Sequence, residues 1–114
     1  MENESILRSI VKLLGPGEDY DYFDPDIILH INSAFARLCE LGVGPKEKPF
    51  TVHDASAVWS DFDPSLELSQ VRTYIYLSVK IIFDPPASST IMETYKKEID
   101  KLEYLLCNVA EFGY

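Results

Sequence analysis

The feature that most constrains the fold is the segment at residues 66–83, LELSQVRTYIYLSVKIIF, which contains no turn signal. Its β-branched and aromatic residues favour a strand by propensity alone. The segment is too long for an ordinary strand, however, and its apolar residues occur on all sides, as in a helix enclosed by other helices. Asp63-Pro64 is a typical helix start. We therefore predict a central buried helix over residues 66–83.

The predicted central helix runs directly into the sequence FDPP. Proline has no backbone N–H, and it disfavours helical geometry in the residue before it. We therefore expect the helix to end at Phe83. Phe83, Asp84, Pro85 and Pro86 are interpreted as a rigid structural corner that fixes the angle between two helices.

Three other segments have helical signatures. Apolar residues at helical spacing predict a helix over residues 6–14, with Asn3 as its cap. Asp24 is placed to cap a second helix, which Gly42 would end in a left-handed conformation. A last long helix should begin at Ser89 or Thr90.

The last predicted helix is amphipathic. Thr90 and Glu93 have the spacing of a capping box. The predicted solvent face carries the charged residues Lys96, Lys97, Glu98, Asp100, Lys101 and Glu103. The predicted apolar stripe on the other face is Ile91, Tyr95, Ile99, Leu102, Leu106 and Val109.

These elements predict an all-α fold, a compact bundle of about four main helices with a short extra helix and a long central loop. The extra helix lies within residues 55–64, where Trp59 and Phe62 should pack on the core. Hydrophobic residues make up 46% of the chain and charged residues 25%, a balance typical of globular proteins. We expect a single domain over residues 1–114, with residues 108–114 as a flexible C-terminal tail.

The charge of the chain excludes some classes of partner. Its formal net charge is -9, so its field repels phosphate backbones and no specific nucleic-acid binding is expected. No signal peptide and no apolar run long enough to cross a membrane is found, so we expect no membrane association. Cys39 and Cys107 lie in apolar helical patterns, which favours buried thiols over a disulfide and a reducing cytoplasm.

The sequence offers little catalytic or metal-binding chemistry. His30 and His53 lie far apart and lack metal-ligand spacing, so both are interpreted as ordinary histidines. The acidic segment at residues 18–26 lacks the glycine and the closing glutamate of a calcium loop. We predict no enzyme activity, no catalytic or metal site and no cofactor.

Four sequence blocks together resemble a known family. They are INSAFARLCELGVGP (31–45), ASAVWSDF (55–62), VRTYIYLSVKIIFDPPASS (71–89) and KLEYLL (101–106). In this order and spacing they are similar to the small head-tail connector proteins, also called adaptor or head-completion proteins, of tailed bacteriophages and prophages of Gram-positive hosts.

The resemblance implies a structural protein that forms a ring beneath the portal and joins the DNA-filled head to the stopper or tail. Its expected partners are the portal protein, the stopper or tail-completion protein and further copies of itself, with a monomer when isolated. The implied location is the host bacterial cytoplasm during assembly and then the head-tail junction of the virion.

Two surfaces and the C-terminal end are candidates for partner contacts. A long irregular loop, Val43 to Asp54, often carries function. Residues 1–64 hold 12 acidic and 5 basic residues, so the first half of the chain is strongly acidic. The mixed-charge face of the last helix could meet this acidic first half in a neighbouring copy. By analogy with the family, the C-terminal end reaches the portal. The candidate interface residues are Lys46, Glu47, Lys48, Phe50, Lys96, Lys97, Lys101, Phe112 and Tyr114.

Two alternative functions are less well supported by the sequence. An acidic helical protein of this size could act as a DNA-mimic inhibitor of a host DNA-binding enzyme. A mimic, however, needs rows of carboxylates at phosphate-like intervals, whereas these acids cluster at loops and helix starts. A small enzyme or metal protein would need a convergent polar pocket, which the sequence does not suggest.

Overall fold

The computed structural model describes residues 4–15, 23–45, 47–62 and 68–112. These residues form four α-helices and one short 3-10 helix, without a β-strand. In chain order the elements are α1 (Ile6–Leu14), α2 (Asp24–Glu40), η2 (Trp59–Asp61), α3 (Leu68–Phe83) and α4 (Ser89–Phe112). The predicted all-α fold is confirmed.

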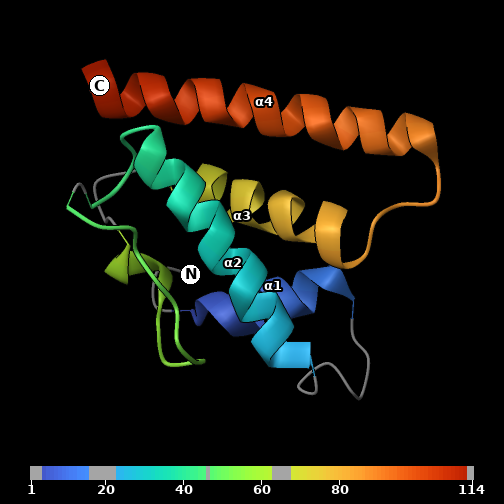
Figure 1. Ribbon diagram of the computed structural model, residues 1–114, viewed down its shortest axis with the longest axis horizontal. Helices are drawn as coiled ribbons and strands as arrows, with labels where there is room; N and C mark the ends of the chain where they lie inside the picture. Colours follow the sequence, from blue (N-terminus) through green and yellow to red (C-terminus); the bar gives the residue numbers. More distant parts are fainter. Residues whose placement is uncertain (1–3, 16–22, 46, 63–67, 113–114) are drawn as a thin grey trace.

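Helix α3 lies at the centre of the bundle, as its sequence predicted. It contacts α1, α2, α4 and η2, and α1 and α4 lie on opposite sides of it (Figure 1). The predicted helix start at Asp63-Pro64 lies outside the described residues. The buried residues of α3 cover a wide arc of the helix, which explains its need for several apolar neighbours. They are Val71, Tyr74, Ile75, Leu77 and Val79.

Helix α1 is capped by Ser5. The Ser5 Oγ accepts a hydrogen bond from the backbone N–H of Arg8 at 3.2 Å. The prediction that Asn3 caps this helix is wrong. The cap directly precedes the first helical residue, and the helix begins at Ile6. Serine at the N-cap satisfies one of the backbone donors left free at a helix start.

The segment around Trp59 closes over α1. Ser5 and Val58 form an isolated antiparallel β-bridge. The Trp59 side chain is 1% exposed, and its indole N–H donates to the Ser9 Oγ at 2.9 Å. Phe62 is also buried. The predicted short helix that packs Trp59 and Phe62 on the core is therefore confirmed.

Helix α2 starts at Asp24, one residue earlier than predicted. Phe23 occupies the N-cap position without a side-chain hydrogen bond, and Asp24 is the first helical residue. The predicted capping role of Asp24 is wrong, because its carboxylate pairs with Arg8 of α1 instead. The Phe23 ring packs edge-on against Phe83 of α3, with 5.6 Å between centroids. Gly42 follows the helix with the predicted left-handed φ of 82°.

The chain between α2 and η2 is attached to α2 by a side chain. The Asn32 amide accepts a hydrogen bond from the Val52 N–H at 2.7 Å and donates one to the Val52 carbonyl at 3.0 Å. Val43 and Val52 are both buried. The long central loop predicted from the sequence is therefore present, and both of its ends are fixed to the core.

Helix α4 begins after a short link of residues 84–88. It starts at Ser89 as predicted, but its cap is Ser88, whose Oγ accepts a hydrogen bond from the Ile91 N–H at 3.3 Å. The predicted capping box of Thr90 and Glu93 is therefore wrong. The helix continues to Phe112, so residues 108–112 of the predicted tail have a helical backbone.

Both cysteines are free and half-buried. The prediction of free thiols is confirmed, but neither thiol is fully buried. The Cys39 Sγ lies 3.8 Å from the Pro45 carbonyl oxygen. Every helix in the described part of the chain is too short or too polar to cross a lipid bilayer.

Candidate partner-binding surfaces

The outer face of α4 carries the predicted lysines. Lys96, Lys97 and Lys101 are all exposed. Among the side chains described on α4, at residues 89–109, Leu102 and Leu106 are the fully buried ones, and both lie in the second half of the helix. The first half of α4 is therefore less covered by the rest of the protein than the second half.

The predicted apolar stripe of α4 is only partly covered. Tyr95 and Ile99 pack against the core as half-buried residues. Ile91, at the start of the same stripe, is 46% exposed. The stripe prediction is correct for Leu102 and Leu106, which are buried, and wrong for Ile91. Val109 is half-buried.

A carboxylate fixes the second half of α4 to two other helices. Glu103 accepts a hydrogen bond from the Tyr74 hydroxyl of α3 at 2.8 Å. The Arg37 guanidinium of α2 lies 3.4 Å from both carboxylate oxygens of Glu103. Arg37 also lies 3.7 Å from Glu40. The sequence had placed Glu103 on the solvent face, so this connection was missed.

Burial is the main cause of the raised pKa of Tyr74. Tyr74 is 2% exposed. Its burial, followed by its hydrogen bond to the Glu103 carboxylate, raises the pKa of Tyr74 well above its usual value. The neutral Tyr74 phenol therefore contributes stability that is fully present below the unfolded-state tyrosine pKa of about 10. This contribution is lost as the pH rises from that value toward the higher pKa of the folded protein.

Replacing Glu103 with alanine should lower the free energy of unfolding by about 1–3 kcal/mol, because the buried Tyr74 hydroxyl loses its acceptor. Two double-mutant cycles measured by urea unfolding test this assignment. The coupling energy between Glu103→Ala and Tyr74→Phe should be larger than that between Glu103→Ala and Arg37→Ala. Arg37 is half exposed, and exposed ion pairs contribute about 0–1 kcal/mol. Equal coupling energies in the two cycles would contradict this assignment.

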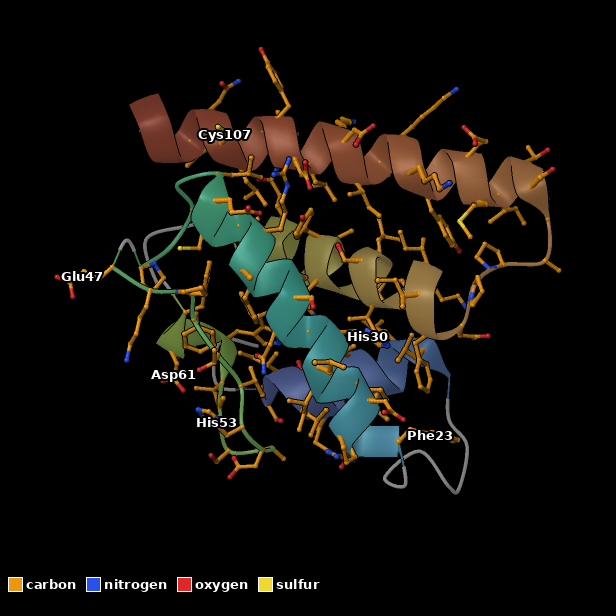
Figure 2. All side chains as sticks on the ribbon, in the orientation of Figure 1. Phe23, His30, Glu47, His53, Asp61 and Cys107 are labelled. Atoms are coloured by element: carbon orange, nitrogen blue, oxygen red, sulfur yellow. The ribbon has the colours of Figure 1, made fainter. Side chains whose placement is uncertain are left out.

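A shallow hollow lies beside Glu103, between α4 and the end of α2. Cys107 lies over this end of α2 in Figure 2. Tyr104 is 68% exposed, the highest fraction among the exposed large apolar residues of the described chain. The hollow therefore combines carboxylates with an accessible ring. Its lining residues are Leu41, Asp100, Glu103, Tyr104, Cys107 and Asn108.

The loop of residues 43–54 has an exposed tip and a packed base. Glu47 and Lys48 are exposed, and Glu47 points away from the helices in Figure 2. Lys46 lies outside the described residues. Phe50 is half-buried, and its ring centroid lies 5.1 Å from that of Phe35 and 5.6 Å from that of Phe62. The described tip thus offers charged side chains, while Phe50 holds the loop against the core.

The predicted corner lies where α3 ends. Phe83 is the last residue of α3, as predicted. Asp84 continues the helical bonding with a 3.0 Å hydrogen bond to the Lys80 carbonyl, and its carboxylate lies 2.8 Å from the Lys80 Nζ. Pro85 is exposed and Pro86 is half-buried. The prolines therefore follow the last helical hydrogen bond and start the link to α4.

The other predicted positions lie elsewhere on the molecule. Phe112 is the last residue of α4, and Tyr114 lies outside the described residues. Figure 2 shows Glu47 and Cys107 on different parts of the molecule, so the loop tip and the second half of α4 are separate surfaces. The structure thus brings no single site together from the predicted interface residues that it describes.

The described residues contain no group of three or more His, Cys, Asp or Glu side chains arranged to hold a metal. His30 is half-buried on α2 and His53 is exposed in the loop. Of the acidic segment at residues 18–26, positions 18–22 lie outside the described residues. The Asp54 carboxylate accepts hydrogen bonds from the hydroxyl and the backbone N–H of Ser56 in the same turn. The bond from the hydroxyl, followed by the bond from the N–H, lowers the pKa of Asp54.

Comparison with known proteins identifies a matching family. A family model described as phage connector protein matches residues 6–112, which span all four α-helices and η2. No curated protein and no solved structure matches the chain.

Proposed function

The chain belongs to the phage connector protein family, and on this premise we propose that it forms a ring beneath the portal of a phage particle. In this role it joins the DNA-filled head to the stopper or tail. The family match over residues 6–112 is the observation that carries the proposal. Membership makes the chain a structural component of the virion, a head-tail connector.

A ring needs two different, complementary surfaces on one subunit, because identical subunits meet head to tail. The exposed lysines of α4 and the acidic first half of the chain are opposite in charge. We assign the contact between neighbouring copies to these two regions. The subunit is expected to be a monomer when isolated and to assemble into the ring on the portal.

The portal contact is assigned to the C-terminal end of α4, including Phe112 and Tyr114. The contact with the stopper or tail-completion protein is assigned to the loop of residues 43–54. The support for the second assignment is the charged, exposed tip of this loop at Glu47 and Lys48 above a base fixed to α2. A fixed base holds the tip in one orientation, which reduces the entropy lost on binding.

The link from Phe83 to Pro86 is assigned the role of fixing the direction of α4 relative to α3. In a ring, this direction sets the relative positions of the surfaces on α4. The net charge of -9 also suits a protein near a DNA channel, because an acidic surface does not retain phosphates. Assembly is proposed to take place in the cytoplasm of a Gram-positive host.

The proposal is tested with the portal ring encoded beside this protein. The purified protein is mixed with the portal ring and examined by electron microscopy, and an added ring of density is expected. Portal rings that remain bare at concentrations well above the micromolar range would overturn the portal assignment.

Deleting residues 109–114 should reduce attachment to the portal by about ten-fold or more, which is about 1.4 kcal/mol. The deletion spares Leu102 and Leu106, which are buried against the rest of the protein, so the protein should still fold. Circular dichroism provides the control for folding. Unchanged attachment of the shortened protein would place the portal contact elsewhere.

A further inference from the structure

We propose that α4 opens from the protein as a unit while α1, α2, α3 and η2 stay folded. The closed helix is the major state, and the open helix is a rare state in equilibrium with it. The link before α4 acts as the hinge, and a few side chains in the second half of α4 hold the helix closed. Such a motion is independent of the proposed ring, because it needs only one copy of the chain.

The core of the protein is built largely without α4. Among the described residues, α4 contributes Leu102 and Leu106 to the fully buried core, and the other members come from the rest of the chain. The hydrogen bond from Trp59 to Ser9 joins η2 to α1, and α1 and α4 lie on opposite sides of α3 (Figure 1). The packing of α1, η2 and α2 on α3 is therefore expected to remain when α4 leaves.

The attachment of α4 is concentrated in its second half. Leu102 and Leu106 are buried there, and Glu103 accepts its hydrogen bond from the Tyr74 hydroxyl of α3. Near the start of the helix, in contrast, Ile91 is 46% exposed. Segments with few buried apolar contacts open at a lower free energy than the whole protein. The closed position of α4 therefore depends on a few contacts, and the opening breaks all of them.

The link between α3 and α4 provides a hinge at Ala87. Pro86 is half-buried and Ser88 caps α4, so the residues on both sides of Ala87 are held in place. Ala87 itself is exposed. In the described part of the chain, no backbone hydrogen bond connects residues 85–87 to another element. A change of backbone dihedral angles at Ala87 would move α4 in one piece, while Pro85 and Pro86 stay with α3 and set the direction of α4 in the closed state.

Hydrogen exchange of the whole protein, measured for each amide by NMR, tests the opening. Each amide reports the free energy of the opening that exposes it to solvent. The slowest amides of α4 should therefore be protected about ten-fold less, or more weakly still, than the slowest amides of α2. Added urea should also accelerate the α4 amides less steeply, because the opening of one helix exposes less surface than global unfolding.

Two polar-to-alanine variants separate the opening from global unfolding. Ser9→Ala removes a contact that persists when α4 is open, so it should accelerate the slowest α2 amides by about ten-fold and leave those of α4 unchanged. Glu103→Ala removes a contact that the opening breaks, so it destabilises the closed state relative to both the open and the unfolded state. It should therefore accelerate the slowest amides of both helices by about ten-fold.

Two results would overturn the opening of α4. They are equal protection of α4 and α2 in the wild-type protein, and a Ser9→Ala variant that accelerates both helices by the same factor. Either result would mean that α4 unfolds only together with the whole protein. Ile10→Val serves the same purpose as Ser9→Ala at a smaller loss of stability, since Ile10 is fully buried on α1. Far-UV circular dichroism shows that each variant is folded.

Discussion

Replacing Trp59 with alanine is expected to lower the free energy of unfolding by about 3–5 kcal/mol, the range for truncating a large buried aromatic side chain. The Trp59 side chain is 1% exposed, and its indole N–H donates to Ser9 on α1 at 2.9 Å. The substitution leaves a cavity between η2 and α1. Urea unfolding followed by far-UV circular dichroism measures the loss.

A second variant separates the hydrogen bond from the buried ring. Ser9→Ala removes the acceptor of the Trp59 N–H but keeps the ring in place, so it should cost about 1–3 kcal/mol. If Trp59→Ala cost no more than Ser9→Ala, the ring would not be part of the core. That result would contradict the packing of η2 on α1.

Replacing Gly44 with alanine should destabilise the fold by about 2–4 kcal/mol, for two reasons that add. Gly44 has a φ of 88°, in the left-handed region that residues with a Cβ avoid. A Cβ there would also lie 2.5 Å from Cε1 and 2.6 Å from Cζ of the Phe62 ring. Phe62 packs on Phe35 and Phe50, so it has little room to move. The melting temperature and urea midpoint report the effect.

Gly42→Ala is the matched control for the ring contact. Gly42 has a similar φ of 82°, but an added Cβ there would meet no atom within 4 Å. It should therefore cost only the backbone strain, about 1–2 kcal/mol. Equal losses for Gly42→Ala and Gly44→Ala would show that the Phe62 ring yields to the new methyl group.

The helices could be predicted from the sequence because periodicity and length are local properties. The end of α3 at Phe83 followed from Pro85 and Pro86, which act on their immediate neighbours. Helix caps were predicted less well, since several polar residues near a helix start compete for the same role. At α2, for example, Asp24 is used by Arg8, a residue of another helix.

The contacts between helices could not be predicted in the same way. Glu103 belongs to a charged stretch of α4, and its contact with Tyr74 depends on how α4 lies on α3. Asn32 is one of several polar residues of α2, and nothing in the sequence sets it apart, yet its amide holds the buried Val52 backbone of the loop. Side-chain amides and carboxylates at such junctions have no local signature. The loop tip and the lysines of α4 were chosen as exposed candidates, but the hollow beside Tyr104 was not foreseen.

The bridge between Ser5 and Val58 has a consequence for how a growing chain reaches this fold. The ribosome delivers α1 first, yet its contacts are complete only when Val58 and Trp59 have emerged. Until then Ile6 and Ile10, both fully buried in the finished protein, have no cover from this segment. Closing so distant a contact costs loop entropy, whereas α3 and α4 are joined by residues 84–88 alone. Of these four helices, the one made before the others is therefore expected to be among the last to reach its final position.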